Sequence, residues 1–203
     1  MARPAPPDDP YGMRIVPTAH EDTYPFISPE KGQMLDIKVL VTGASKGIGR
    51  ATVKSFARAG ASAIALLARS ALDDVTREVL EAARAAGRKE PQVLTLQADM
   101  SDPAAVQKAM DTVAREFGSL DVLVNNASRL EQWYPLAETD VTDWWRTWEV
   151  NVKGTYIVTR AALPLVVKGQ LKTIVTLTSA GAFTSAYGLV LFPLSSCLPS
   201  PRE

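Results

Sequence analysis

The stretch KVLVTGASKGIGR, residues 38–50, constrains the fold of this chain more than any other. Its first half is a short apolar run that ends in glycine, which is the pattern of a buried strand. Gly43, Gly47 and Gly49 lie at the junction between this run and a helix with apolar helical spacing. Glycine adopts backbone conformations that other residues resist, and it lets a ligand approach the main chain. The stretch therefore predicts a strand, a tight turn and a helix, the opening unit of a parallel α/β sheet.

The same alternation continues along the next 130 residues. Strands are expected at 38–43, 62–68, 92–97, 120–127 and 172–179, and helices at 48–60, 72–87, 101–118, 140–150 and 151–168. Strands that alternate with helices are joined by parallel crossovers. The expected fold class is α/β, a doubly wound parallel sheet that is incomplete at its C-terminal edge. Three tryptophans of the fourth helix, Trp144, Trp145 and Trp148, are expected to pack in the core.

This pattern divides the chain into three segments. Residues 1–33 contain seven of the fourteen prolines, so this part is expected to be an extended arm. Residues 34–188 form the predicted α/β domain. Residues 189–203, LVLFPLSSCLPSPRE, show neither the pattern of a strand nor the apolar spacing of a helix, and they are expected to be an irregular tail.

Charge and composition exclude several classes of protein. Lys+Arg and Asp+Glu both number 22, so no basic excess is available for nucleic acid or an anionic membrane. No apolar stretch approaches the roughly 20 residues of a membrane helix, and the N-terminus lacks a secretory pattern. The single cysteine, Cys197, cannot form an internal disulfide, which favours a reducing compartment. We expect a cytoplasmic protein with no nucleic-acid or membrane partner and no metal site.

The glycine turn is a candidate anion site. The helix that begins after it offers unpaired N–H groups and the positive end of its dipole. No Gly-Lys-Ser/Thr comes after the glycines, so the turn is not a P-loop. A tight turn without a ligand is the alternative.

The end of the second strand indicates which dinucleotide would bind. An NAD site places an acidic residue there for the ribose hydroxyls. This chain has Ala68, Arg69 and Ser70, and Lys46 lies in the glycine turn. Two cations and a hydroxyl suit a 2′-phosphate, so NADP(H) is favoured over NAD(H). An ordinary exposed charge is the alternative for Arg69.

Four motifs together resemble the short-chain dehydrogenase/reductase family, classical type. TGASKGIG (42–49) matches its TGxxxGIG cofactor motif, and NNAS (125–128) resembles its NNAG motif, with a departure at Ser128. NVKG (151–154) resembles its asparagine-containing helix start. TLTS (176–179) resembles the strand that delivers its active-site serine. The resemblance implies a Rossmann-like NAD(P)-binding domain.

The resemblance also implies residue roles. Cofactor-binding positions would be Gly43, Ser45, Lys46, Gly47, Ile48, Gly49, Arg69, Ser70, Asp99, Met100, Asn125 and Ala127. Asp99 would lie at the adenine with the Met100 backbone beside it, although a cap of the next helix is its alternative. Asn125 would mainly stabilise its strand, and Ala127 would line the cofactor.

Catalysis in this family passes a hydride between nicotinamide and a carbonyl carbon, while a tyrosine exchanges a proton with the substrate oxygen. Asn151 and Ser179 would be the catalytic asparagine and serine. The tyrosine of the Tyr-x-x-x-Lys motif is expected thirteen residues after the serine, where Phe192 stands, and Ser196 stands at the lysine position. A phenol with a pKa near 10 is a poor base without a nearby cation. Tyr187 is the one nearby alternative, and no lysine lies four residues beyond it.

Three hypotheses of function remain open. The chain would be an NADP(H)-dependent oxidoreductase acting on a small carbonyl or alcohol substrate, a non-catalytic NADP(H)-binding module, or a partial polypeptide without independent function. The pattern breaks at about Gly188, and the segment beyond that residue resembles a replaced or misread end. The family forms homo-oligomers through the helix after Asn151 and the helix that bears the tyrosine and lysine. Loss of the latter helix weighs against such an oligomer here.

Overall fold

The computed structural model describes residues 20, 22–130 and 136–179. Its one sheet contains five parallel strands in the order β3-β2-β1-β4-β5. The strands are β1 (Lys38–Thr42), β2 (Ala63–Ala68), β3 (Gln92–Gln97), β4 (Val122–Asn125) and β5 (Thr173–Thr176). The helices are α1 (Gly47–Arg58), α2 (Asp73–Ala85), α3 (Pro103–Phe117), α4 (Val141–Trp148) and α5 (Thr155–Val166). The predicted α/β fold with a Rossmann-like parallel sheet is confirmed.

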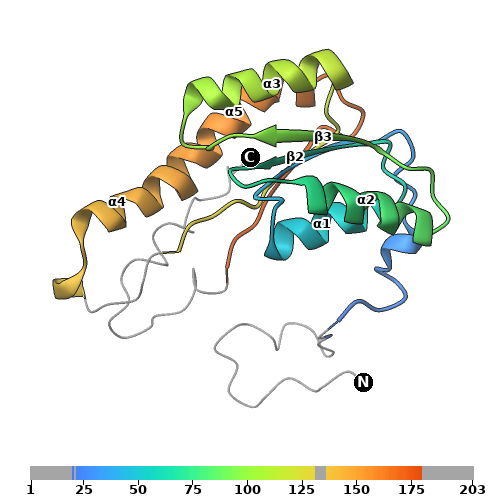
Figure 1. Cartoon of the computed structure of the whole chain (residues 1–203), viewed down its shortest axis with the longest axis horizontal. Coiled ribbons are helices and arrows are strands. Elements are labelled where there is room, and N and C mark those ends of the chain that lie inside the picture. Colours follow the sequence, from blue (N-terminus) through green and yellow to red (C-terminus); the bar gives the residue numbers. More distant parts are fainter. Residues whose placement is uncertain (1–19, 21, 131–135, 180–203) are drawn as a thin grey trace, which may run out of the picture.

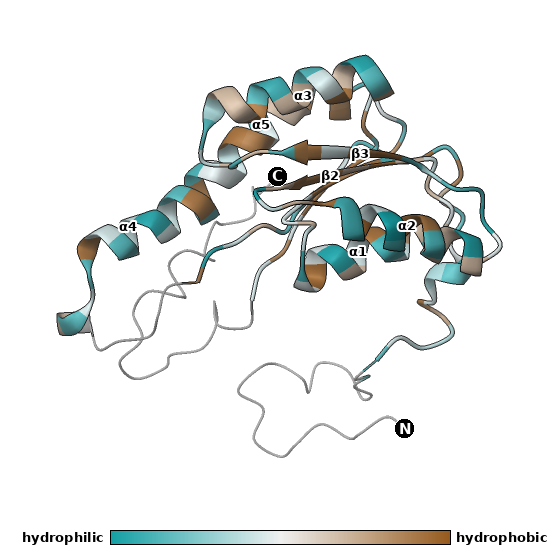
Figure 2. Cartoon of the chain, viewed as in Figure 1, coloured by the Kyte–Doolittle hydropathy of each residue, from teal (hydrophilic) through white to brown (hydrophobic). Residues whose placement is uncertain are grey.

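Helices cover the sheet on both faces (Figure 1). Helices α1 and α2 pack on one face against Val39 and Val41 of β1, whereas α3 and α5 pack on the other face against Leu40. All three of these side chains are fully buried. Successive residues of a strand point to opposite faces, so a sheet covered on both sides needs a continuous apolar run. Figure 2 shows hydrophobic residues along the strands and a mixture of both kinds on the helices.

Local signals set the ends of α3. Its N-cap is Asp102, whose carboxylate accepts hydrogen bonds from the backbone N–H groups of Ala104 at 2.9 Å and Ala105 at 3.2 Å. Pro103 occupies the first turn, where its missing N–H costs no hydrogen bond. Gly118 ends the helix with a φ of +75°. Since Asp102 is the cap, the alternative interpretation of Asp99 as the cap is wrong.

The helix pair α4 and α5 is continuous rather than broken near residue 150. A π-helical segment, Glu149–Gly154, joins the two, and α4 projects beyond the sheet (Figure 1). Only Thr147 of α4 is buried, and Trp145 is 55% exposed. The prediction that the three tryptophans pack in the core is wrong, because α4 extends past the layer that would cover them: Trp145 is exposed, and Trp144 and Trp148 are only half-buried and belong to neither core cluster.

The edge strand β5 and the segment that precedes β1 are less buried than the centre of the sheet. All four residues of β5 are exposed in the described structure. In the segment expected to be extended, Pro29–Lys31 forms one turn of 3-10 helix, and the Arg88 guanidinium donates to the carbonyls of Glu30 and Gly32. That turn corrects the extended-arm prediction for these three residues.

Tyr187, Phe192 and Ser196 lie outside the described residues. No helix in the described part is long and apolar enough to cross a membrane.

Candidate functional site

An open cleft lies at the carboxyl ends of the central strands and has a volume of about 530 Å³. Strand order reverses at β1, and this switch point is where ligands bind in open α/β sheets. The cleft is lined by Gly43, Ser45, Lys46, Gly47, Ile48, Leu67, Ala68, Arg69, Ser70, Ala98, Asp99, Met100, Asn126, Ala127, Ser128, Arg129, Leu130 and Val150.

The three glycines of the turn serve different physical needs. Gly43 has a φ of +67°, and a Cβ there would lie 2.8 Å from the Ala127 Cα. Gly47 has a φ of +55°, and a Cβ there would meet nothing within 4 Å. Gly49 lies behind the cleft, where a Cβ would stand 2.3 Å from the Gly43 carbonyl oxygen. Gly49 thus lets α1 approach the turn, and Gly47 leaves open space in front of the first N–H groups of α1, which lack intrahelical partners.

The residues that follow β4 hold the glycine turn in place through hydrogen bonds. The Asn126 Nδ2 donates to the Thr42 carbonyl at 2.8 Å and to the Gly43 carbonyl at 3.4 Å. In return the Thr42 hydroxyl accepts from the backbone N–H groups of Asn126 at 3.0 Å and Ala127 at 2.9 Å. These bonds join the ends of β1 and β4. The turn is therefore held in shape before any ligand arrives, which lowers the entropic cost of binding.

At the far end of β2, Arg69 and Ser70 line the cleft together with Asp99. The Arg69 guanidinium is 72% exposed and lies 3.7 Å from the Asp99 carboxylate. Asp99 also accepts from the Ser101 backbone N–H at 2.9 Å and from its hydroxyl at 2.7 Å. Burial alone would raise the pKa of Asp99, but the hydrogen bonds from Ser101 and the charge of Arg69 outweigh it and lower that pKa. The carboxylate is thus held ionised near neutral pH.

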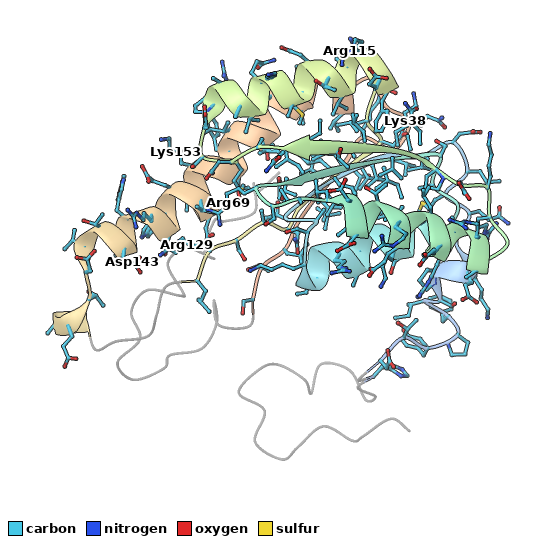
Figure 3. All side chains as sticks on the ribbon, viewed as in Figure 1. Lys38, Arg69, Arg115, Arg129, Asp143 and Lys153 are labelled. Atoms are coloured by element: carbon cyan, nitrogen blue, oxygen red, sulfur yellow. The ribbon has the colours of Figure 1, made fainter. Side chains whose placement is uncertain are left out.

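The opposite end of the cleft is formed by the loop after β4 and by the π-helical segment. The Asn151 side chain accepts from the Arg129 backbone N–H at 2.8 Å and donates to the Arg129 carbonyl at 2.9 Å. The Arg129 side chain reaches α4, where it meets Asp143 and Thr147 (Figure 3). Ser179 comes after β5 at the same carboxyl edge of the sheet.

Most residues predicted to hold a cofactor line one cleft, and two do not. Gly49 supports the turn from behind. Asn125 is buried between β4, α5 and β5, where its Nδ2 donates to the Thr159 hydroxyl at 3.0 Å and lies 3.5 Å from the Thr176 hydroxyl. The catalytic candidate Asn151 touches the cleft only through Arg129.

Two polar residues that line the cleft and hold its walls together were missed in the sequence. Asn126 is the second amide of the NNAS motif, and the threonine that precedes Gly43 is its partner 84 residues away. The repeated amide at a strand end was the available signal. Arg129 gave no signal, since an arginine in a loop is usually a solvated charge.

The arrangement suits a long anionic ligand. Lys46 and Arg69 line the cleft, and Asp99 is the one carboxylate among its lining residues, while the charge of Arg129 is paired with Asp143. Main-chain N–H groups at a helix start, in a glycine turn with open space before it, are the usual cradle of a phosphate. Within the described residues, no cluster of histidine, cysteine or carboxylate side chains could hold a metal ion. The fold and cleft together define the class of dinucleotide-binding α/β proteins.

Comparisons with known proteins narrow this class. The model of the short chain dehydrogenase family matches residues 38–193. The chain belongs to the short chain dehydrogenase family, which is a family of oxidoreductases.

Individual relatives agree with the family assignment. The chain is 53% identical over 177 residues to the short chain dehydrogenase mpl6 of Monascus purpureus, a match that covers 87% of this chain and 61% of that protein. It thus spans about three fifths of the length of such curated relatives.

Solved structures give the same result. A Shigella flexneri short chain dehydrogenase complexed with NADP superimposes with a TM-score of 0.69 at 26% identity, over 82% of this chain and 69% of that one. Carveol dehydrogenase from Mycobacterium avium, in complex with NAD, superimposes with a TM-score of 0.69 at 21% identity, over 81% and 62%, and shows the fold alone.

Proposed function

We propose that the cleft binds NADP(H) in preference to NAD(H), as part of an oxidoreductase that acts on a small carbonyl or alcohol. One observation carries the preference: Arg69 and Ser70 directly follow the last residue of β2, Lys46 precedes α1, and all three line one cleft. An NAD site places an acid at the end of this strand. NADP bound to the Shigella relative supports the same proposal.

In this proposal different groups of the chain bind different parts of the ligand. The N–H groups of the 43–49 turn hold the pyrophosphate, and Lys46 and Arg69 hold the 2′-phosphate with the Ser70 hydroxyl. Asp99 and the Met100 backbone lie at the adenine, and Ala127 lines the middle of the cleft. When bound, the nicotinamide group supplies or accepts hydride. Asn151 and Ser179 stand at that end.

Residues 1–203 are proposed to bind NADP(H) without efficient turnover. Ser179 can hydrogen-bond a substrate oxygen, but it cannot supply a proton at neutral pH as a phenol paired with a lysine can. Phe192 and Ser196 occupy the positions expected for that pair, and no lysine occurs after Lys172. The alternative is turnover with Tyr187 as the proton donor.

The test uses purified chain 1–203 with NADPH and NADH. Isothermal titration should show NADPH bound at least about tenfold more tightly, the effect of one charge-assisted contact. A mixture of aldehydes and ketones should cause no loss of NADPH absorbance. Equal affinity for the two cofactors would overturn the preference. Turnover that Tyr187→Phe abolishes would establish the alternative.

Association and location complete the proposal. Residues 1–203 are expected not to form the homo-oligomer of the family, since Phe192 and Ser196 stand where the tyrosine and lysine of one interface helix are expected. The other helix of that interface, α5, borders an apolar hollow of about 520 Å³ lined in part by Val152 and Tyr156. Sedimentation tests this expectation: the parent protein should be a monomer, and a dimer that Tyr156→Arg dissociates would contradict it. A cytoplasmic location is supported by the single cysteine.

A further inference from the structure

The Arg129 side chain forms three bonds to α4. One of its terminal nitrogens donates to the Asp143 carbonyl at 3.1 Å and to the Thr147 hydroxyl at 2.9 Å, and the other pairs with the Asp143 carboxylate. Its side chain is 27% exposed. Charge-assisted bonds in a fixed fork are the strong and directional kind. The guanidinium therefore fixes the loop to the first two turns of α4.

The backbone of the same residue fixes a different element. Its N–H and its carbonyl bond to the two side-chain atoms of Asn151, in the π-helical segment that continues from α4. Arg129 thus touches α4 through its side chain and the π-helical segment through its main chain. Arg129 lines the cleft, and so do the residues on either side of it, Ser128 and Leu130, together with Val150.

Resting on the proposed function, we infer that Arg129 is a positioning residue, which sets the nicotinamide end of the cleft through α4 rather than by contact with the ligand. Its guanidinium is occupied by Asp143 and Thr147, so its charge is already balanced. Arg129 holds α4 in place, and the position of α4 in turn sets the positions of Asn151 and of the cleft-lining residues Ser128–Leu130.

Asp143 distinguishes positioning from direct contact. Asp143 does not line the cleft. If Arg129 acts through α4, loss of the Asp143 carboxylate weakens binding in the same way as loss of Arg129. If Arg129 instead binds a phosphate, removal of Asp143 frees the guanidinium and strengthens binding. The two mechanisms predict opposite signs for Asp143→Ala.

The experiment titrates the full chain with two probes. NADPH spans the whole cleft, and adenosine 2′,5′-bisphosphate fills only the adenosine end. Arg129→Met and Asp143→Ala should each weaken NADPH binding roughly tenfold, within the range of coupling through packed elements. Neither should change the affinity for adenosine 2′,5′-bisphosphate. Arg129→Lys, whose ammonium can still pair with Asp143, should recover part of the loss.

Arg146→Met is the matched control, because Arg146 is an exposed arginine of the same helix. It should leave both affinities unchanged. Equal weakening of both probes, with a lowered melting temperature, would mean a general loss of structure and would overturn the inference. Tighter NADPH binding by Asp143→Ala would overturn it in favour of direct contact. Failure of the parent protein to bind either probe would refute the proposed function itself.

Discussion

The two ends of the cleft are built in different ways. The phosphate end consists of main chain: a glycine turn, a helix start and the Thr42–Asn126 bonds that fix them. The other end, where the nicotinamide is proposed to lie, is held by side chains from the loop after β4, from α4 and from the π-helical segment, with Arg129 bonded to both Asn151 and Thr147. The proposed dinucleotide binding therefore depends on backbone geometry that one βα unit and one strand end supply. Chemistry depends on side chains that the fold must bring together from separate segments.

The largest expected effect is at the back of the phosphate end. A Cβ at Gly49 would stand 2.3 Å from the Gly43 carbonyl oxygen and 2.5 Å from the Asn126 Nδ2. Gly49→Ala should therefore lower the free energy of unfolding by about 2–3 kcal/mol, a typical overpacking cost. NADPH binding should be lost with it. Urea denaturation and titration measure both, and a variant as stable as the parent protein would show that the approach of α1 is not tight.

The next effect concerns the end of β2. Arg69→Gln should weaken NADPH binding about tenfold by removing a charged partner of the 2′-phosphate, and leave NADH binding unchanged. Arg77→Gln is the matched control, because Arg77 is an exposed arginine of α2 paired with Asp74. Parallel losses for NADPH and NADH would indicate that Arg69 contributes to binding in general and does not select NADP(H).

A pair of glycines separates backbone strain from ligand contact. Gly47 and Gly87 both have positive φ, and at both a Cβ meets nothing within 4 Å. Alanine at either should lower the free energy of unfolding by about 1 kcal/mol, the cost of a left-handed residue. Only Gly47→Ala should weaken NADPH binding, because only Gly47 lines the cleft. Equal affinities in the two variants would show that the ligand does not approach this turn.

The smallest expected effect is a loss of folding stability at acid pH, with NADPH binding at neutral pH unchanged. Glu78 on α2 pairs with Arg50 and Lys54 on α1, and its hydrogen bond from Arg50 is the main reason that its pKa falls from 4.5 to about 2. Because the folded-state pKa is depressed, this stabilisation is present above about pH 4.5 and is lost as the pH falls through about 2.

Thermal melting of Glu78→Gln across this range is the measurement. The variant should melt below the parent protein at pH 6, and the difference should shrink toward pH 2. Glu81→Gln, an exposed glutamate of the same helix, is the control. A difference that stays constant with pH would contradict this prediction.

Local patterns were sufficient to predict the sheet and its helices. The run Val39, Leu40 and Val41 requires cover on both faces, and both faces are covered. The proline in the first turn and the glycine at the end of the segment 101–118 were enough to predict α3, whose bounds are Pro103 and Phe117. These signals act within a few residues, which is why sequence patterns contain them.

The remaining features depend on pairs that are distant in the sequence. The bond from Asn126 to Thr42 joins residues 84 apart, and the Arg129–Asp143 pair forms only once α4 has its place. The position of α4 also explains the error at Trp145. An apolar side chain predicts burial only where another layer covers it, and α4 projects beyond the sheet.

Amide hydrogen exchange of chain 1–203 with and without NADPH tests the central claim most directly. If the ligand's phosphates rest on the glycine turn, the amides of residues 43–49 should exchange more slowly in the complex. Those of α3 should be unaffected, since no residue of α3 lines the cleft. Saturating NADPH that leaves exchange at 43–49 unchanged would contradict the account.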